Sequence, residues 1–147
     1  MQELNFVHEI TPEDYLSLRE EVGWKNYPLE QARTGLSNTA YVIAVRDGER
    51  TVAVTRLLWD GGYSAFISDV IVSPEYQGRG IGRKMLEDVI DYLEQQLQPG
   101  YRIMITLLSA HGKEEFYQKF DFTSRPTETF GPGMHRWLDK EGVAKKA

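Results

Sequence analysis

The stretch Val70-Ile-Val-Ser-Pro-Glu-Tyr-Gln-Gly-Arg-Gly-Ile-Gly82 joins a short apolar strand to a glycine-rich turn that opens a helix. The helix is predicted because apolar residues recur at helical spacing over residues 81–97. The bare backbone of the turn lets a ligand approach its amides at Gly78, Gly80 and Gly82. Three cations stand where the helix dipole disfavours positive charge, namely Arg79, Arg83 and Lys84. The stretch therefore predicts a site for a polyanion at the helix start.

The glycine spacing separates this turn from two common nucleotide-binding motifs. Arg83 stands where G-x-G-x-x-G requires its third glycine, and no acidic residue ends a second parallel strand at the right distance. No Gly-Lys-Ser or Gly-Lys-Thr follows, so the turn is not a P-loop. Two interpretations remain: a different kind of phosphate-binding turn, and a tight strand-to-helix connection whose cations point into water.

The remaining motif is Gln77-x-x-Gly80-x-Gly82. It resembles the Q/R-x-x-G-x-G/A pyrophosphate-binding signature of the Gcn5-related N-acetyltransferases (GNAT), and the V-x-V strand before it matches that family as well. The resemblance covers residues 6–122 and is to small bacterial members with a single domain. It implies an α/β (α+β) fold with a mixed, mostly antiparallel central sheet flanked by helices, and acetyl-CoA as the co-substrate.

The resemblance also assigns the cofactor contacts. In that family the strand before the signature binds the pantetheine like an extra strand, and one of its amides, here from Val70, Ile71 or Val72, polarises the thioester carbonyl. Such an oxyanion contact is typically worth about 3 kcal/mol. The residues implied to hold the pyrophosphate and the 3′-phosphate are Gln77, Gly78, Arg79, Gly80, Ile81, Gly82, Arg83 and Lys84.

Tyr117 is the candidate general acid. It matches the family tyrosine on the helix after the fifth strand, whose hydroxyl lies near the sulfur of the coenzyme. A phenol suits the task because its ordinary pKa, about 10, is close to that of the leaving thiol. The alternative is a half-buried core tyrosine beside Phe116 and Phe120. The dipeptide Asp121-Phe122 stands where the family has Gly-Phe, and Asp is tolerated in a left-handed backbone position.

Asp69 is the first candidate for the base that deprotonates the amine. We expect it between Ile67 and Ile71 on one face of the central strand, where desolvation would make a carboxylate a stronger base. The alternative is a buried carboxylate satisfied by backbone amides or by Arg56. An amine can also lose its proton to bound water, with no dedicated base.

Other candidate residues carry weaker signals. Glu30 is the second candidate base, because in the family that the chain resembles this helix pair borders the acceptor cleft. The alternative is an exposed helical Glu that is simply solvated. His111, near the start of the Tyr117 helix, is the third and could equally cap that helix. Trp24 and Tyr27 are candidates for the wall of an acceptor pocket, and aromatic core or rim positions are the alternative.

Composition limits the class of protein. The chain of 147 residues is 41% apolar and 12% aromatic, which fits one compact domain. The resemblance then implies one N-acetyltransferase domain over residues 1–140, followed by a short tail at 141–147. A net charge of −5 argues against nucleic-acid binding. There is no cysteine nucleophile, and three scattered histidines predict no metal site. No signal peptide or membrane-spanning run is recognised, so we expect a cytoplasmic protein without a membrane partner.

The predicted elements are a strand, two helices, three strands, the signature helix, a strand, a helix and terminal strands, with one crossover in an otherwise antiparallel run. Thr11 is the expected N-cap of the first helix, and Pro28 is expected to begin the second. A hairpin turn is expected at Asp47-Gly48. The expected strands are 3–10, 41–45, 51–59, 63–72, 101–108 and a last strand that ends at residue 137 after the loop 131–135.

The function that the resemblance implies is transfer of an acetyl group to a primary amine, small-molecule or protein-bound, by direct attack in a ternary complex. The absence of cysteine fits direct attack better than a covalent relay. The alternative is a non-catalytic CoA-binding regulatory or interaction module, against which the presence of Tyr117 argues. A third interpretation is a domain for an unrelated phosphate ligand, which simple nucleotides would stabilise as well as CoA does. The sequence is compatible with a homodimer.

Overall fold

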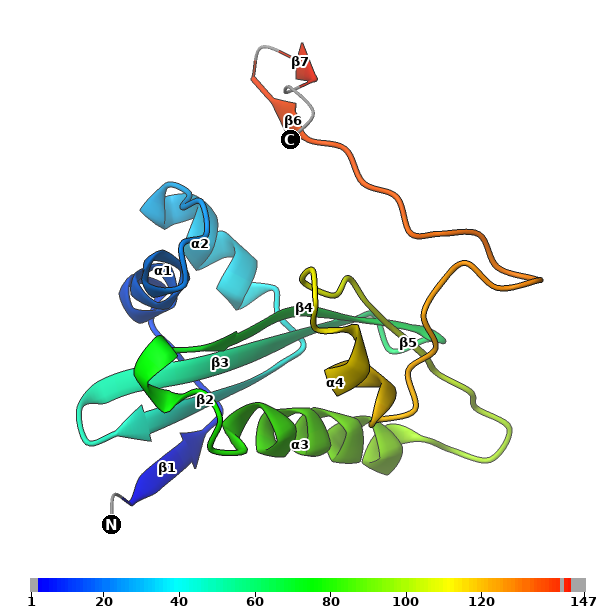
Figure 1. Ribbon diagram of the computed structural model, residues 1–147, viewed down its shortest axis with the longest axis horizontal. Helices are drawn as coiled ribbons and strands as arrows, with labels where there is room; N and C mark the ends of the chain where they lie inside the picture. Colours follow the sequence, from blue (N-terminus) through cyan, green and yellow to red (C-terminus); the bar gives the residue numbers. More distant parts are fainter. Residues whose placement is uncertain (1–2, 141, 144–147) are drawn as a thin grey trace. The chain divides into compact units, whose positions relative to one another are not determined.

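The computed structural model describes residues 3–140 and 142–143, which form two compact units that divide after Leu107. The first unit contains β1 (Leu4–Val7), α1 (Pro12–Glu21), α2 (Leu29–Ser37), β2 (Tyr41–Asp47), β3 (Arg50–Trp59), β4 (Ser64–Val72), the 3-10 helix η1 (Pro74–Tyr76), α3 (Ile81–Gln96) and β5 (Met104–Leu107) (Figure 1). The second unit contains α4 (Glu114–Gln118) and the short strands β6 (Leu138–Asp139) and β7 (Gly142–Val143).

The first unit is built on a five-stranded sheet with the order β1-β2-β3-β4-β5. The neighbours from β1 to β4 are antiparallel, whereas β4 and β5 are parallel. The parallel pair arises because α3 carries the chain back along the sheet before β5 begins. The predicted mixed, mostly antiparallel sheet flanked by helices is therefore confirmed.

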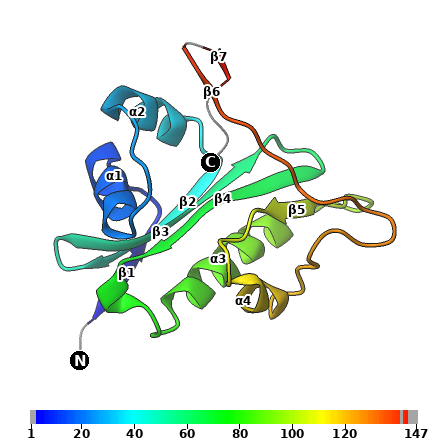
Figure 2. The same cartoon turned by 45° about the horizontal axis from the view of Figure 1, so that its top comes forward.

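Helices cover both faces of this sheet, α1 and α2 on one face and α3 on the other (Figure 2). Consecutive residues of β3 show the division. Val54 belongs to the buried cluster that includes Leu18 of α1, whereas the hydroxyl of Thr55 contacts the sulfur of Met85 of α3 at 3.7 Å. Because β3 is covered on both faces, the consecutive residues 51–55 are all buried.

Local capping chemistry explains where the helices begin. Thr11 is the N-cap of α1, as predicted, and its hydroxyl accepts a hydrogen bond from the amide of Asp14 at 3.1 Å. Pro28 is the N-cap of α2 rather than its first residue. Gly80 is the N-cap of α3 in a left-handed conformation (φ 81°), which glycine adopts without strain. α3 therefore begins directly at the end of the glycine-rich turn.

Some predicted boundaries were wrong where strand pairing decides them. β1 and β5 are shorter than the predicted 3–10 and 101–108, because only four residues of each pair with a neighbouring strand. The tight turn between β2 and β3 is Gly48-Glu49 rather than Asp47-Gly48, since Asp47 pairs with Arg50. The loop 131–135 was correct, but the described residues form no strand ending at residue 137; β6 begins at Leu138 and pairs with β7.

The predicted tail at 141–147 includes β7, and its residues 141 and 144–147 lie outside the described residues. The single domain over residues 1–140 stays a prediction. In the described part of the chain, no helix combines the length and apolar character needed to cross a membrane.

Candidate functional site

β4 has two halves that differ in their hydrogen-bonded neighbours. The first half pairs with β3 on one edge and with β5 on the other, and the pairing with β5 ends at Ile67 opposite Leu107. The second half, residues 68–72, pairs with β3 alone among the described strands. Its other edge, called the open edge below, therefore presents backbone groups without a strand partner.

A β-bulge separates the two halves. Arg56 of β3 pairs with Asp69, and the next residue, Leu57, pairs with Ile67. Ser68 and Asp69 therefore lie together opposite Arg56. Adjacent residues of β3 point to opposite faces of the sheet, and cross-strand partners share a face. It follows that Asp69 and Ile67 point to opposite faces.

The bulge corrects one expectation from the sequence. Asp69 points to the face that α1 covers, because its carboxylate contacts the hydroxyl of Tyr15. Ile71 packs in the buried cluster on the same face, as expected, but Ile67 does not share that face. The prediction that Asp69 lies between Ile67 and Ile71 on one face was therefore wrong. In a regular strand, side chains alternate between the two faces of the sheet. The extra residue in the bulge shifts this alternation by one position, so a prediction based on a constant period of two assigns Ile67 to the wrong face.

The bulge also decides which amides line the open edge. The amide of Ser73 donates to the carbonyl of Val52 in β3 at 2.8 Å. Because successive amides of a strand alternate in direction, the amide of Ile71 also points to β3. The amides of Val70 and Val72 then point to the open edge. Of the residues predicted to offer an oxyanion contact, these two have amides that can reach a ligand there.

The side chain of Gln77 lies at the far end of the open edge. Its Nε2 donates a hydrogen bond to the carbonyl oxygen of Val72 at 2.9 Å. The glutamine that was predicted to contact the pyrophosphate thus connects the end of β4 to the turn. This contact supplies the Val72 carbonyl with a partner and leaves the amide beside it facing outward.

The glycine-rich turn leads into a helix start whose amides are available. Gly78 and Gly80 have positive φ values of 78° and 81°, and a Cβ on either would meet no atom within 4 Å. The Lys84 amide donates to the Gly80 carbonyl at 3.2 Å, so the amides of residues 81–83 precede the helical ladder. The first turn of α3, which is fully described, contains no acidic residue. The turn therefore offers backbone donors and a positive helix end to a polyanion.

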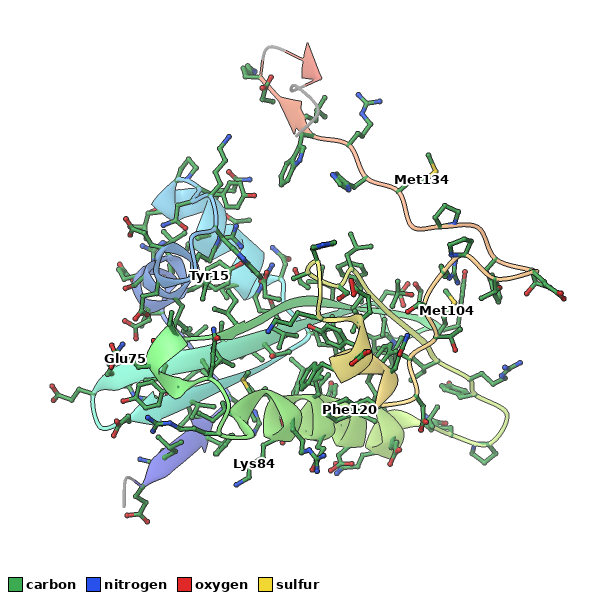
Figure 3. The ribbon with its side chains drawn as sticks, viewed as in Figure 1. Tyr15, Glu75, Lys84, Met104, Phe120 and Met134 are labelled. Carbon is green, nitrogen blue, oxygen red and sulfur yellow. The ribbon has the colours of Figure 1, made fainter. Side chains whose placement is uncertain are left out.

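The three cations of the turn are exposed. Arg79 lies back over η1, where its Nη2 donates to the carbonyl of Glu75 at 3.0 Å and its guanidinium carbon lies 4.8 Å from the centroid of the Tyr76 ring. The ammonium of Lys84 lies 5.8 Å from the ring centroid of Phe6, on the outer side of α3 (Figure 3). These charges, with Arg83, make the surroundings of the turn positive, and their contacts with phosphates stay a prediction.

Asp69 belongs to a buried ion-pair network, and its side chain is 7% exposed. Its Oδ2 accepts hydrogen bonds from the hydroxyl of Tyr15 at 2.7 Å and from Nε of Arg56 at 2.8 Å. Its Oδ1 lies 3.7 Å from Nη1 of Arg19. Donors thus already engage this carboxylate, which favours the alternative of a buried carboxylate satisfied by Arg56. The role as a base stays a prediction.

Arg56 connects this network to the bulge and to the end of α2. Its Nη2 donates to the hydroxyl of Ser68 at 3.1 Å. Its Nη1 donates to the hydroxyl of Thr39 at 3.1 Å and to the carbonyl of Gly35 at 3.4 Å. Together with the Nε bond to Asp69, every nitrogen of the guanidinium donates to the chain. One side chain therefore holds both bulge residues and the end of α2.

Tyr15 completes the network from α1 (Figure 3). Burial, followed by the charge and the hydrogen bond of Asp69, raises the pKa of Tyr15 from 10.0 to about 12, against smaller opposing effects of Arg56 and Arg19. The phenol therefore remains a protonated donor to Asp69 throughout the neutral range.

Trp24 and Tyr27, the residues predicted for an acceptor pocket, lie around Arg19 of α1. The guanidinium carbon of Arg19 lies 5.2 Å from the ring centroid of Trp24 and 4.9 Å from that of Tyr27. Its Nη2 donates to the carbonyl of Lys25 at 2.7 Å, whereas its buried Nε has no hydrogen-bond partner among the described residues. Both aromatic side chains thus contact a cation that also faces Asp69.

The two weaker candidate bases are exposed. Glu30 forms an ion pair with Arg33 at 3.3 Å on α2, and its side chain is 80% exposed, as the solvated alternative predicted. His111 precedes α4 in a turn, and Lys113 is the N-cap of that helix, so the capping alternative for His111 was wrong.

Tyr117 lies on α4 in the second unit, within an aromatic group. Its ring centroid lies 5.1 Å from that of Phe116 and 6.2 Å from that of Phe122, and Phe116 also contacts Phe120. Burial raises the pKa of Tyr117 above its ordinary value, so the phenol is protonated at neutral pH. Asp121 has a φ of 66°, the left-handed conformation expected for it. The role of Tyr117 as an acid stays a prediction.

An open groove of about 460 Å³ lies elsewhere in the first unit, between the end of β1, α2 and the start of β2. His8, Arg33 and Tyr41 are among its lining residues, and no residue predicted for the site is. Among the described residues, no group of three or more His, Asp and Glu side chains is arranged to hold a metal ion.

Sequence reasoning missed Tyr15, Arg19 and Ser68, and it considered Arg56 only as a partner of Asp69. One signal was present: Ser68 and Asp69 are consecutive polar residues between the apolar residues 65–67 and 70–72, and such a pair interrupts the period of two as a bulge does. No sequence pattern around Tyr15 and Arg19 predicts their contacts with Asp69, because these contacts depend on how α1 packs against β4.

The sequence profile of the Acetyltransferase (GNAT) family matches residues 4–122, which is most of the chain and includes β4, the glycine-rich turn and α4. The chain belongs to this family. The predicted family is therefore confirmed, and the match covers both the open edge and the turn.

Individual acetyltransferases are similar to this chain in sequence and in fold. The chain is 31% identical to the uncharacterized N-acetyltransferase ycf52 of Pyropia yezoensis over 113 residues, which cover 74% of this chain and 63% of that protein. It therefore spans less than two thirds of the length of that relative. A probable acetyltransferase of unknown function from meticillin-resistant Staphylococcus aureus is 28% identical, with a TM-score of 0.80 over 90% of this chain and 98% of that chain. An aminoglycoside N-acetyltransferase in complex with CoA shares the fold, with a TM-score of 0.66 and 11% identity over 90% of this chain and 96% of that chain.

Proposed function

We propose that this protein transfers the acetyl group of acetyl-CoA to a primary amine by direct attack in a ternary complex. The observation that carries the proposal is the continuous path from the open edge of β4, through the glycine-rich turn, to the start of α3. An extended ligand arm needs backbone partners along a strand edge, and a pyrophosphate needs donors at a helix start. Family membership and the N-acetyltransferase names of relatives support the same activity.

The residues of the first unit fit acetyl-CoA. The amides of Val70 and Val72 face the open edge, where they would bind the pantetheine, and one of them would stabilise the negative charge that develops on the thioester oxygen. Bound acetyl-CoA supplies an activated acyl carbon to the amine. The residues that would hold its phosphates through backbone amides and positive charge are Gly78, Arg79, Gly80, Ile81, Gly82, Arg83 and Lys84.

Tyr117 would protonate the leaving thiolate. The raised pKa of its phenol, caused by burial, keeps the proton that an acid must deliver. We expect Tyr117→Phe to lower kcat about 10²-fold with an unchanged Kd for acetyl-CoA. Tyr63→Phe is the matched control, because the side chain of Tyr63 is 69% exposed and the same hydroxyl is removed from the surface. Equal kcat in Tyr117→Phe and in the unaltered chain would exclude Tyr117 as the acid.

The proton of the amine has four proposed destinations: Asp69, Glu30, His111 and bound water. The acidic limb of the pH–rate profile distinguishes them, because this limb reports protonation of the base. Loss of the limb in Glu30→Gln or in His111→Gln would identify that residue. Retention of the limb in both variants leaves Asp69 and water, which Asp69→Asn and Arg56→Lys distinguish.

The acceptor is proposed to be a small-molecule or protein amine. The net charge of −5 favours a cationic acceptor over a nucleic acid. We further propose that the protein works in the cytoplasm and that a homodimer is compatible with this activity. These proposals rest on composition and family membership.

The first experiment measures thermal stabilisation by acetyl-CoA and CoA against ATP and NAD, followed by thiol release across a panel of amines. Stabilisation by the CoA pair alone, with thiol release for at least one amine, is the expected result. Equal stabilisation by ATP would favour a domain for an unrelated phosphate ligand. Stabilisation by CoA without turnover on any amine would favour a non-catalytic CoA-binding module. No shift with either CoA species would refute the proposed function.

A further inference from the structure

We infer that Arg56 and Asp69 are positioning residues whose ion pair holds the β-bulge at Ser68 and thereby selects the amides of β4 that face the open edge. The inference rests on the proposed function, because it concerns the strand proposed to bind pantetheine and to polarise the thioester. In this inference Asp69 positions β4, and it does not accept the proton of the amine.

The bulge reverses which residues direct their backbone groups to the open edge. Before the bulge, the carbonyl of Tyr63 accepts a hydrogen bond from the amide of Met104 at 2.6 Å, so the odd-numbered residues of this half point to β5. After the bulge, the even-numbered Val70 and Val72 point to that edge. Without the extra residue, the amide of Ile71 would face the open edge and those of its two neighbours would face β3.

Arg56 is placed to hold this bulge, because it is the residue of β3 that lies opposite both bulge residues. Its guanidinium donates to the hydroxyl of Ser68 at 3.1 Å and to the carboxylate of Asp69 at 2.8 Å. A bulge locally disrupts the backbone ladder, and here one cation bridges the disrupted position. The side chains of Arg56 and Asp69 are 13% and 7% exposed, so water screens their attraction little.

The rest of the network holds Asp69 from the opposite direction. Tyr15 donates to the same carboxylate oxygen as Arg56, and Arg19 faces the other oxygen at 3.7 Å. The bulge is therefore tied to α1, and through Arg56 to the end of α2 as well. A displacement of about 1 Å in a group that positions reacting atoms can cost about 10²-fold in rate. Contacts that hold the bulge thus control the reaction without touching the substrate.

The test compares three variants with a matched control. Asp69→Asn removes the charge that Arg56 faces, Arg56→Lys removes the fork that spans the bulge, and Ser68→Ala removes one hydrogen bond without altering a charge. Asp88→Asn is the control, because Asp88 also accepts a tyrosine hydroxyl at 2.7 Å, from Tyr41, but lies on α3. The control repeats the chemical change of Asp69→Asn away from β4.

We measure kcat, the Kd for acetyl-CoA and the pH–rate profile. Asp69→Asn and Arg56→Lys are each expected to lower kcat about 10²-fold at every pH, to weaken acetyl-CoA binding about tenfold and to keep the acidic limb at its original pH. The double variant should lose little more than either single variant, since both break one contact. A base role predicts the reverse: Asp69→Asn alone loses the acidic limb, acetyl-CoA binding is retained and Arg56→Lys stays active. That pattern would overturn the inference.

Hydrogen exchange gives a readout that does not depend on activity. The amides of Ile71 and Ser73, which point to β3, are expected to exchange about tenfold faster in Asp69→Asn than in Asp88→Asn. If Asp69→Asn does not fold, Ser68→Ala replaces it as the test variant. We then expect faster exchange of the same amides and a kcat that is lowered a few-fold. Unchanged exchange and kcat in both Ser68→Ala and Arg56→Lys would refute the inference. An unaltered chain that neither binds acetyl-CoA nor releases thiol refutes the proposed function instead, whatever the exchange shows.

Discussion

The two halves of β4 belong to one strand but are held in different ways. Residues 64–67 have backbone partners on both edges, in β3 and β5. Among the described strands, β3 alone pairs with residues 68–72, and side chains hold these residues at each end: Arg56 and Asp69 at the bulge, and Gln77 at the turn. An edge kept open for a ligand forgoes half of its ladder bonds, and specific side-chain contacts then have to fix its shape.

Proline substitutions in the open half give the sharpest test of this difference. Val70→Pro and Val72→Pro each remove an amide that faces the open edge, whereas Ile71→Pro removes one bonded to β3. We expect kcat to fall about 10²–10³-fold when the amide that polarises the thioester is lost, with cooperative unfolding retained. Ile71→Pro should instead lower the free energy of unfolding by about 3 kcal/mol.

Steady-state kinetics and denaturant unfolding of the three proline variants provide the measurement. Val70→Pro and Val72→Pro serve as controls for each other, because in the proposed function one amide polarises the thioester carbonyl while the other only contributes to acetyl-CoA binding. A stable Ile71→Pro variant, together with full activity in both others, would show that the assigned amide directions are wrong.

A second test concerns the turn in which the open half ends. Gly80→Val places a β-branched side chain at φ 81° beside the proposed pyrophosphate site, and Gly48→Val does the same at φ 62° in the β2–β3 hairpin. Each should lower the free energy of unfolding by about 1–2 kcal/mol, because both positions are left-handed. We expect only Gly80→Val to weaken acetyl-CoA binding, by about 100-fold in calorimetric Kd, or about 2.7 kcal/mol. Equal affinities of the two variants would contradict the pyrophosphate assignment.

The network that holds the open half also predicts a pH dependence of stability. The pKa of Tyr15 is raised from 10.0 to about 12 in the fold, so the folded chain favours the protonated phenol. This contribution is complete below pH 10.0, the unfolded value, and is lost as the pH rises to about 12. Two pKa units correspond to about 2.7 kcal/mol.

Tyr15→Phe should therefore flatten part of the fall in stability between about pH 10 and pH 12. At neutral pH it should lower the free energy of unfolding by about 1.5–3 kcal/mol, because the hydroxyl donates to a charged group. Urea unfolding at a series of pH values measures both effects. Parallel curves for the variant and the unaltered chain would show that Tyr15 does not titrate within the network.

The smallest effect is expected at the far end of the open edge. Gln77→Leu removes the hydrogen bond to the Val72 carbonyl and should weaken acetyl-CoA binding by about 3–5-fold, or about 0.6–1 kcal/mol. Gln118→Leu is the control, because Gln118 likewise donates to a single oxygen, the hydroxyl of Ser124. A loss as large as that of Gly80→Val would mean that Gln77 contacts the cofactor directly.

Predictions from the sequence succeeded where the signal is local. Thr11 was recognised as an N-cap, and Gly80 and Ile81 as the start of a helix, because a cap or a left-handed glycine depends on a few adjacent residues. Predictions failed where pairing intervenes. The turn at Asp47 was placed one residue early and Ile67 was assigned to the wrong face, because strand register depends on the partner strand.

The candidate site divides in the same way. The glycines and cations of the turn were identified from their order alone, as was the strand that leads into it. Asp69 was identified as an unusual residue, but its partners Tyr15 and Arg19 were not, because they lie on a helix whose packing against β4 no local pattern encodes. Only these contacts show that Asp69 is ion-paired, and its role as a base stays a prediction.

By itself the sequence determined the family, the order of helices and strands and the glycine-rich turn, because helical periodicity, capping and glycine spacing operate within a few residues. Only the tertiary structure decided that β4 loses its β5 partner after Ile67, that a bulge at Ser68 turns the amides of Val70 and Val72 outward, and that Arg56 spans that bulge. The physical reason is that an open edge and a bulge are properties of a pair of strands, and a single strand carries no record of where its neighbour ends.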